Sequence, residues 1–278
     1  MKMYKKEMNG RQFQIADYAG EKETIIAIHG LTGTHKNMHY YAEALKGEHR
    51  FIAVDLRGRG NSSGLPSEPS IFNHATDIID LIQELEIEKP ILMGHSMGAI
   101  ISAIVASKSS SIKGLILLDG AAEMSSHQID VVKPSLGRLA ERYESKEVYV
   151  KNVKNLYERL GVTWTPALQN IVEYEIHQVA DHWEHKSARE KIMEDFKSFY
   201  LFDPKEIMSE VDCQALLVYA RGDIGPFPPL FFESDYALTK KHTTNLTSVI
   251  SNCNHYTMVF EKREEIIRVI KDFLKGVG

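Results

Sequence analysis

The chain has 278 residues, of which 43% are hydrophobic and 26% charged, a composition typical of soluble globular proteins and unlike that of disordered or collagen-like chains. At roughly 150 residues per domain, this length suits either two small domains or one large α/β domain with a sizeable core. The 33 Lys and Arg against 38 Asp and Glu give a net charge of -5, and no basic run is longer than Lys240-Lys241, which argues against a nucleic-acid groove or an anionic-membrane surface. We therefore expect the partner to be a small molecule.

The first residues lack the apolar run of about 7–15 residues that a signal peptide needs. The most apolar stretch, residues 99–106, is far shorter than the ~18–20 residues of a membrane span. We therefore expect a cytoplasmic protein. Cys213 and Cys253 make no disulfide framework, and both are expected to be ordinary packed thiols.

Two alternating runs, residues 4–8 and 11–18, are joined by Asn9-Gly10 and predict an antiparallel hairpin at the sheet edge. Short apolar, β-branched runs then alternate with longer segments of helical periodicity, which is the pattern of crossover units in a parallel sheet. The strand-like runs cover residues 24–30, 50–58, 90–96, 114–120, 215–223 and 247–251. The helical segments cover residues 37–46, 71–85, 97–108 and 261–275.

The strand rhythm stops over residues 121–210, where amphipathic helical stretches at 145–160, 166–182 and 188–199 fill the chain. A structureless loop of this length would be implausible in a compact domain. The sequence therefore predicts an α/β core formed by residues 1–120 and 211–278, with a mostly parallel central sheet of about eight strands flanked by helices. Residues 121–210 are expected to form an all-helical cap, or lid, over one sheet edge.

The sequence Gly-His-Ser-Met-Gly at residues 94–98 falls between a predicted strand and a predicted helix. This is the nucleophile elbow pattern, in which a sharp turn strains the Ser backbone and flanking glycines avoid a clash. A second Gly-x-Ser-x-Gly match at residues 60–64 is followed by several residues without a helix and lacks that setting. We therefore predict Ser96, rather than Ser62, as a nucleophile.

A nucleophilic serine needs a general base and an acid that orients the base. His255 is the predicted base, because it lies in the loop between the last predicted strand and the C-terminal helix; the alternative is a structural role at the start of that helix. Asp223, at the end of the preceding strand, is the predicted acid. Its rivals are Asp119, which also ends a strand, and more weakly Glu123. The order Ser96, Asp223, His255 is the nucleophile, acid and base order of one hydrolase architecture.

Two backbone N–H groups are expected to form an oxyanion hole. The N–H of Met97 lies at a helix N-terminus, where donors are free and the dipole favours negative charge. The second donor is expected from Leu31, in the loop after the third strand. His29 in that loop, and Arg57 and Arg59 after the next strand, are expected to be structural.

His177, His182 and His185 suggest a metal site at first sight. On a helix, however, they would point in different directions, and no His-Glu-x-x-His motif is present. We therefore expect no metal. The aromatic residues of the insertion are expected mainly to pack between helices, with some lining a pocket.

Five motifs spread over residues 28–261 read IHGLTG, DLRGRGNSSG, GHSMGA, ARGD and NHYTMVFE. With these motifs the chain resembles the α/β-hydrolase superfamily. The resemblance implies a triad of Ser96, Asp223 and His255, a helical cap between strands six and seven, and no cofactor. The chain departs from the family pattern at Ala220, where relatives often carry Gly, and in the proline-rich GPFPPLFF that follows the acid.

The expected function is that of a serine hydrolase, similar to small carboxylesterases, that cleaves a carboxylic ester or lactone of a small to medium, mainly apolar substrate through an acyl-enzyme on Ser96. The alternatives with the same triad are a C–C bond hydrolase and a cofactor-free haloperoxidase. The alternative of another class is a non-catalytic, hydrolase-like protein that binds a small molecule. The physiological substrate and the oligomeric state stay open at this point.

Overall fold

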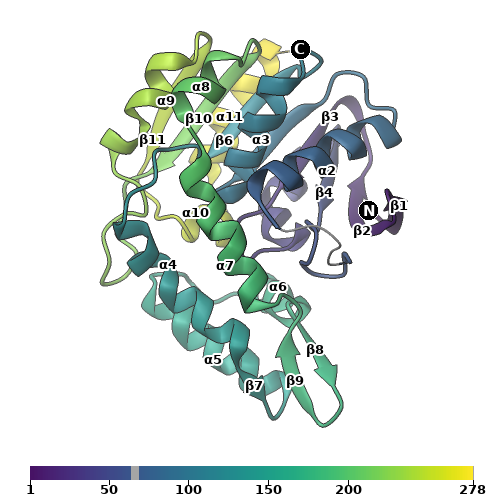
Figure 1. Ribbon diagram of the computed structural model, residues 1–278, viewed down its shortest axis with the longest axis vertical. Helices are drawn as coiled ribbons and strands as arrows, with labels where there is room; N and C mark the ends of the chain where they lie inside the picture. The colour runs from purple at the N-terminus through teal and green to yellow at the C-terminus, as the bar shows by residue number, and fades with distance from the viewer. Residues whose placement is uncertain (64–68, 278) are drawn as a thin grey trace.

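An eight-stranded sheet forms the centre of the computed structural model, which describes residues 1–63 and 69–277 (Figure 1). Its strand order is β1-β2-β4-β3-β5-β6-β10-β11. The strands are β1 (Lys2–Met8), β2 (Arg11–Tyr18), β3 (Gly20–Ile28), β4 (Gly47–Val54), β5 (Ile91–His95), β6 (Gly114–Leu118), β10 (Gln214–Ala220) and β11 (Leu246–Ser251). The prediction of a mostly parallel sheet of about eight strands is confirmed.

The first two strands form the predicted hairpin at one edge of the sheet. Asn9 and Gly10 both have positive φ, 50° and 72°, as the tight two-residue turn between antiparallel strands requires. β2 also pairs antiparallel with β4, and all other neighbouring strands of the sheet are parallel. β5 and β6 are buried along their whole length, which explains why their sequences are continuous apolar runs without alternation.

Helices cover both faces of the sheet. α2 packs on α3 and α3 on α8, whereas α1 packs with α11, which lies behind the sheet in Figure 1. α3 is buried from Met97 to Ala106 because it lies between the sheet and these helical neighbours. The helices of the core are α1 (His39–Leu45), α2 (Ile71–Glu84), α3 (Met97–Lys108), α8 (Pro204–Ser209), α9 (Ala237–His242), α10 (Thr257–Phe260) and α11 (Glu264–Val277), with the 3-10 turns η1 (His35–Met38) and η4 (Glu233–Tyr236). α8 falls within residues 121–210, which are expected to form the cap, but it packs on α3 and α9 of the core.

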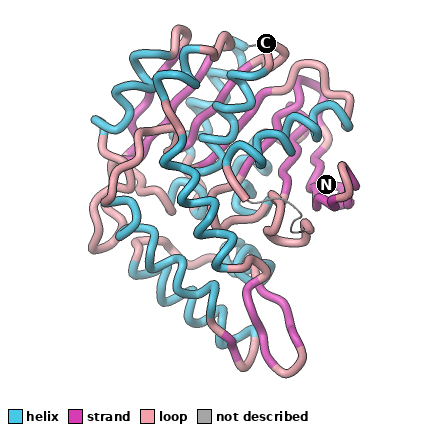
Figure 2. Tube along the Cα trace, viewed as in Figure 1, coloured by secondary structure: helices cyan, strands magenta, loops and turns pink. Residues whose placement is uncertain are grey.

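The prediction that residues 121–210 are all helical is wrong in part. They also contain a three-stranded sheet of order β7-β9-β8, visible as the hairpin at the lower end of Figures 1 and 2. The helix expected over residues 166–182 ends at Tyr174. Strands of two to four residues are too short to show alternation, so helical periodicity alone did not reveal them. The elements of the insertion are α4 (His127–Gly137), η2 (Arg138–Ala140), β7 (Arg142–Tyr143), α5 (Lys146–Arg159), α6 (Pro166–Tyr174), β8 (Ile176–Val179), β9 (His182–His185), α7 (Arg189–Ser198) and η3 (Phe199–Leu201).

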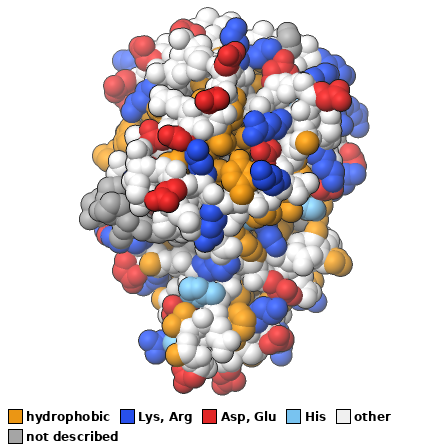
Figure 3. All heavy atoms as spheres, turned by 90° about the vertical axis from the view of Figure 1, so that its right-hand side faces the viewer, with side chains coloured by type: hydrophobic (Ala, Val, Ile, Leu, Met, Phe, Trp, Pro, Cys, Tyr) orange, Lys and Arg blue, Asp and Glu red, His pale blue; other side chains and the backbone are white. Residues whose placement is uncertain are grey.

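The insertion lies below the sheet in the view of Figure 1, and α7 leads from it back to the core. Positive and negative side chains are interspersed on the face drawn in Figure 3. Among the described residues, no helix combines the length and the apolarity that crossing a membrane would take. Cys213 and Cys253 are both free thiols, as expected.

Candidate active site

Ser96 lies at the turn between β5 and α3, with φ of 57° and ψ of -118°. Holding a non-glycine residue in such a conformation costs on the order of 1–3 kcal/mol. The turn is tight because two glycines leave no room for a side chain. A Cβ added at Gly94 would lie 2.0 Å from the carbonyl oxygen of Gly98, and one at Gly98 would lie 2.1 Å from that of Ile28. The strand, turn and helix predicted around Ser96 are confirmed.

His255 lies against a buried carboxylate. Its Nδ1 is 2.7 Å from Oδ2 of Asp119, and both side chains are almost wholly buried. The other oxygen of Asp119 accepts hydrogen bonds from the backbone N–H of Ala220 and from the hydroxyl of Tyr236, each at 2.9 Å. These contacts fix the carboxylate, and the carboxylate in turn fixes the ring of His255.

The prediction that Asp223 orients His255 is therefore wrong. Asp223 is exposed, and its backbone carbonyl accepts a hydrogen bond from Nδ2 of Asn254 (3.1 Å). Glu123 is exposed as well. Asp119 and Asp223 follow adjacent parallel strands, so both lie at the same edge of the sheet and spacing along the chain does not separate them.

The two residues predicted to supply oxyanion donors lie beside Ser96. Met97 is the first residue of α3, and the first N–H groups of a helix have no acceptor within the helix. Leu31 follows Gly30 in a turn that is closed by a hydrogen bond from the N–H of Gly33 to the carbonyl of Gly30 (3.1 Å). A Cβ at Gly30 would lie 3.3 Å from Cβ of Ser96, so this turn runs directly against the serine.

Two histidines next to the site are held neutral by burial. His29 donates from Nδ1 to the carbonyl of Gly30 (2.7 Å) and accepts from the N–H of Leu56 at Nε2 (3.0 Å), and burial lowers its pKa to about 3. This is the structural role predicted for His29. His95, which the sequence did not single out, donates from Nε2 to the carbonyl of His255 (3.0 Å). Burial, and then the charge of neighbouring His255, hold the pKa of His95 well below its usual range.

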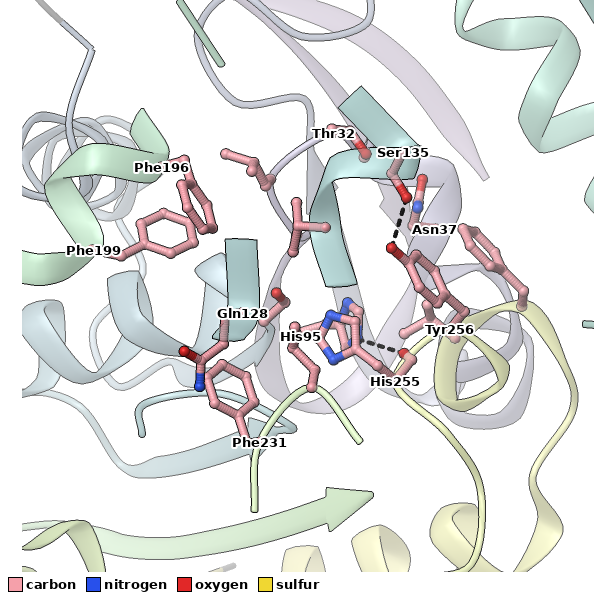
Figure 4. A pocket seen from close by; sticks show the side chains of 18 of the residues that line it. Thr32, Asn37, His95, Gln128, Ser135, Phe196, Phe199, Phe231, His255 and Tyr256 are labelled. Atoms are coloured by element: carbon pink, nitrogen blue, oxygen red, sulfur yellow. Dashed lines mark hydrogen bonds between the residues drawn. The ribbon is translucent and has the colours of Figure 1, made fainter. Parts of the chain in front are cut away.

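Ser96 and His255 line one cavity of about 60 Å³ at the junction of core and insertion (Figure 4). Most of its wall is apolar, as is usual for sites that bind small molecules. Residues of the insertion that line it include Gln128, Val132, Ser135, Phe196 and Phe199. The sequence predicted that some aromatic residues of the insertion line a pocket, as Phe196 and Phe199 do. It did not identify the individual residues, because the wall is assembled from elements that lie far apart along the chain.

The second Gly-x-Ser-x-Gly match has a structural role. The hydroxyl of Ser62 donates to the carbonyl of Asp55 (2.6 Å) and accepts from the N–H of Gln14 (2.8 Å). The last glycine of this motif, Gly64, lies outside the described residues.

Arg57 and Arg59 brace the loop after β4, as expected. Arg57 pairs with Asp77 (2.5 Å), and Arg59 donates to the carbonyl of Leu31 (3.1 Å) and pairs with Asp195 of α7. Arg59 therefore joins the turn at residues 30–33 to the insertion.

His177, His182 and His185 lie on strands and not, as predicted, on a helix. His177 and His182 both lie near Glu184, and buried His185 faces Glu175 at 3.8 Å. Over residues 1–63 and 69–277, no group of three or more metal-ligating side chains comes together.

The chain is similar to known proteins in sequence and in fold. Residues 23–171 match the model of the family described as alpha/beta hydrolase fold. The chain is 33% identical to the esterase YbfF of Escherichia coli over 110 residues, 38% of this chain and 42% of that protein. It is 34% identical to the dihydrolipoyllysine-residue acetyltransferase component of the acetoin cleaving system of Pseudomonas putida over 103 residues, 37% of this chain and 28% of that protein. The matched segments thus span less than half the length of these two relatives.

Longer matches are more distant. A putative carbamate hydrolase, RutD of Rhizobium rhizogenes, is 25% identical over 206 residues, 73% of this chain and 76% of that protein. The crystal structure of E-2-(acetamidomethylene)succinate hydrolase superposes with a TM-score of 0.85 at 18% identity and covers 98% of both chains. The enol-lactonase of Burkholderia xenovorans superposes with a TM-score of 0.73 at 17% identity, over 98% of this chain and 100% of that one. At these identities the structures share the fold.

Proposed function

The chain belongs to the alpha/beta hydrolase fold family, and from that premise we propose that it is a serine hydrolase acting on a carboxylic ester or lactone of small to medium size. The observation that carries the proposal is the hydrogen bond between buried Asp119 and His255, which lines the same cavity as the strained residue Ser96. A nucleophile, a base and an acid that orients the base are the three parts that acyl transfer through serine requires.

In the proposed reaction, His255 takes the proton of the Ser96 hydroxyl as its oxygen attacks the scissile carbonyl. Asp119 holds the ring through Nδ1 and stabilises the imidazolium that forms. The N–H groups of Leu31 and Met97 donate to the oxyanion, and each such donor supplies about 3–4 kcal/mol of transition-state stabilisation. The imidazolium then protonates the leaving alcohol, and the acyl group stays on Ser96.

The second half of the proposed reaction releases the acid. His255 removes a proton from water, the resulting nucleophile attacks the acyl-enzyme carbonyl, and a second oxyanion forms at the same two N–H groups. Collapse of this intermediate breaks the bond to Ser96, and His255 returns the proton to the serine oxygen. The cycle needs no group beyond these side chains and backbone donors.

The bond type is the finer part of the proposal. The names of the relatives include an esterase and a putative carbamate hydrolase, and both reactions attack a carbonyl that bears a heteroatom leaving group. We propose the ester or lactone because the oxygen of an alcohol leaves a tetrahedral intermediate more readily than an unprotonated nitrogen, which would have to depart as an amide anion. A panel of esters, lactones, carbamates and amides matched in acyl size ranks these bonds by kcat/KM.

Substitution of Ser96 tests the proposal directly. We expect Ser96→Ala to abolish hydrolysis of p-nitrophenyl esters while the far-UV circular dichroism spectrum stays unchanged. Ser62→Ala is the matched control, because Ser62 lies in the other Gly-x-Ser-x-Gly match and bonds only structural partners. Ester turnover that survives Ser96→Ala in purified, folded protein would overturn the proposal.

A further inference from the structure

The cavity beside Ser96 has two chemically different sides. Figure 4 shows Phe196 and Phe199 grouped on one side of the His95 and His255 rings. Asn37, Ser135 and Tyr256 are grouped on the other side (Figure 4). A substrate whose scissile carbonyl lies at the serine therefore meets mainly aromatic rings in one direction and several hydrogen-bonding groups in the other. Gln128 also lies on the side of the rings (Figure 4); its Oε1 accepts from the backbone N–H and the hydroxyl of Ser125 (2.7 and 2.9 Å), and its Nε2 is buried without a partner among the described residues.

Asn37 presents an amide donor with a fixed orientation. Its Oδ1 accepts a hydrogen bond from the backbone N–H of Thr34 (3.0 Å), so the oxygen is turned to the backbone and the NH2 group is turned away from it. Asn37 is only 6% exposed and lines the cavity, and its Nδ2 has no acceptor within the part of the chain that the structure describes. A donor that lines the cavity without an acceptor in the protein is available to bind a substrate oxygen.

Tyr256 and Ser135 form a hydroxyl pair on the same side. Their oxygens are 2.6 Å apart, so one hydroxyl donates to the other. The hydrogen of the accepting hydroxyl stays available to a third oxygen. The pair therefore adds a second donor near the amide of Asn37 without adding charge.

Behind the polar side of the cavity, the charges of Arg138 and Glu175 balance each other. The guanidinium of Arg138 donates to the carbonyl of Ser135 (2.5 Å) and to the hydroxyl of Thr32 (3.3 Å), and it lies 3.4 Å from the carboxylate of Glu175. Arg138 and Glu175 are both buried, so the positive charge is compensated within the protein. The polar side thus offers hydrogen-bond donors and little net charge, which favours a neutral acceptor over a carboxylate.

We infer that the substrate carries a neutral oxygen acceptor, such as a ketone or ester carbonyl, on one side of the scissile bond and an apolar group on the other. Asn37 and the hydroxyl pair of Tyr256 and Ser135 bind the acceptor, and Phe196 and Phe199 pack on the apolar group. The inference rests on the proposed function. Sites whose hydrogen-bond donors are held in place discriminate strongly between substrates with and without the acceptor oxygen, because a substrate that lacks this oxygen leaves those donors unpaired.

Two matched substrate pairs test which side of the scissile bond faces the polar groups. p-Nitrophenyl pentanoate and p-nitrophenyl 4-oxopentanoate differ by one ketone in the acyl group, and butyl and 3-oxobutyl butanoate differ by one ketone in the alcohol. In one of the two pairs we expect the oxo ester to have a kcat/KM about tenfold higher, the effect of roughly one good hydrogen bond. Ratios within about twofold in both pairs would overturn the inference.

Variants assign the preference to the named residues. Asn37→Asp keeps the oxygen that accepts from Thr34 and removes the NH2 donor, and Tyr256→Phe keeps the ring, 5.6 Å from that of His255, and removes the hydroxyl. Either change should bring the ratio of kcat/KM between the oxo ester and its matched ester close to one. Ser135→Ala removes the other hydroxyl of the pair and should have the same effect. Tyr18→Phe, on β2, is the matched control and should retain the wild-type preference.

The outcomes separate the two proposals. If neither member of either pair is hydrolysed, the proposed serine hydrolase fails and this inference falls with it. If all esters are hydrolysed and the variants keep the wild-type ratio, only the inference fails. A faster reaction with the p-nitrophenyl monoester of glutarate, which carries a carboxylate, than with the 4-oxopentanoate ester would contradict a neutral acceptor.

Discussion

Asp119 is placed to act through His255. Its two oxygens accept hydrogen bonds from His255, Ala220 and Tyr236, so the carboxylate has no freedom to turn away. Asp119 also has a positive φ of 45°, which turns the chain sharply at the end of β6. A buried, fully bonded carboxylate of this kind fixes the tautomer and the orientation of its histidine.

Exchanging each of the two aspartates for asparagine distinguishes their roles. We expect Asp119→Asn to lower kcat for ester hydrolysis about 10³–10⁴-fold, because the amide cannot stabilise an imidazolium at His255. Asp223→Asn, at the exposed position, should change kcat less than about threefold. Equal losses in the two variants, or a larger loss at Asp223, would contradict the assignment.

The sequence predicted some residues of the candidate site and missed others. Ser96 and His255 could be predicted because the elbow motif and the position near the C-terminus are local signals. The acid could not, since Asp119 and Asp223 both follow parallel strands and only the fold shows which side chain reaches His255. The departures from the family pattern at Ala220 and in the proline-rich segment after Asp223 were the available signal against Asp223.

Among the elements, α7 is tied to the core by a buried cluster. Asp195 pairs with Arg59, and its Oδ1 is 3.1 Å from Nε2 of His74 on α2. Burial alone would raise the pKa of Asp195, but the charge of Arg59 and the hydrogen bond with His74 outweigh it and lower the pKa. Since Arg59 also binds the carbonyl of Leu31, the same side chain contacts the insertion and the turn at residues 30–33.

Removing the negative charge from this cluster should destabilise the protein. We expect Asp195→Asn to lower the free energy of unfolding by about 3 kcal/mol or more, because it leaves the guanidinium of Arg59 buried without its partner. Asp272→Asn, which breaks an exposed pair with Lys275, is the control and should leave the free energy of unfolding almost unchanged. Urea denaturation measures the free energy of unfolding of both variants. A loss in Asp195→Asn no larger than that in Asp272→Asn would show that the pair of Asp195 and Arg59 does not stabilise the fold.

The elements themselves were largely predictable, and the exceptions have a common cause. The hairpin turn at Asn9-Gly10 and the buried parallel strands carry strong local patterns. β7, β8 and β9 are two to four residues long and rich in polar residues, and they pair only with one another. Such strands are defined by their neighbours in space, which periodicity along the chain does not report.

On the scale of the whole molecule, buried histidines make stability depend on pH. Burial lowers the pKa of His29, His74, His95 and His185 in the folded protein, whereas an unfolded histidine titrates near 6.5. Below about pH 6.5 the unfolded chain therefore binds protons that the folded protein does not bind. Stability must fall as the pH falls in this range, because unfolding takes up protons.

We accordingly expect the free energy of unfolding to be greatest above about pH 6.5 and to drop between pH 6.5 and 5. Each such histidine contributes a slope on the order of 1 kcal/mol per pH unit until its folded-state pKa is reached. Urea denaturation at pH 7, 6 and 5 gives the slope. A free energy of unfolding that stays constant or rises toward pH 5 would contradict this account of the buried rings.

If Ser96 is a nucleophile activated by His255 and Asp119, the folded protein reacts with a fluorophosphonate at neutral pH. Peptide mass spectrometry then locates the modification. We predict one adduct per chain, on Ser96, and strongly slowed labelling in Asp119→Asn but not in Asp223→Asn. Folded protein that stays unlabelled, or that is labelled at another residue, would contradict the claim and favour a non-catalytic binding protein.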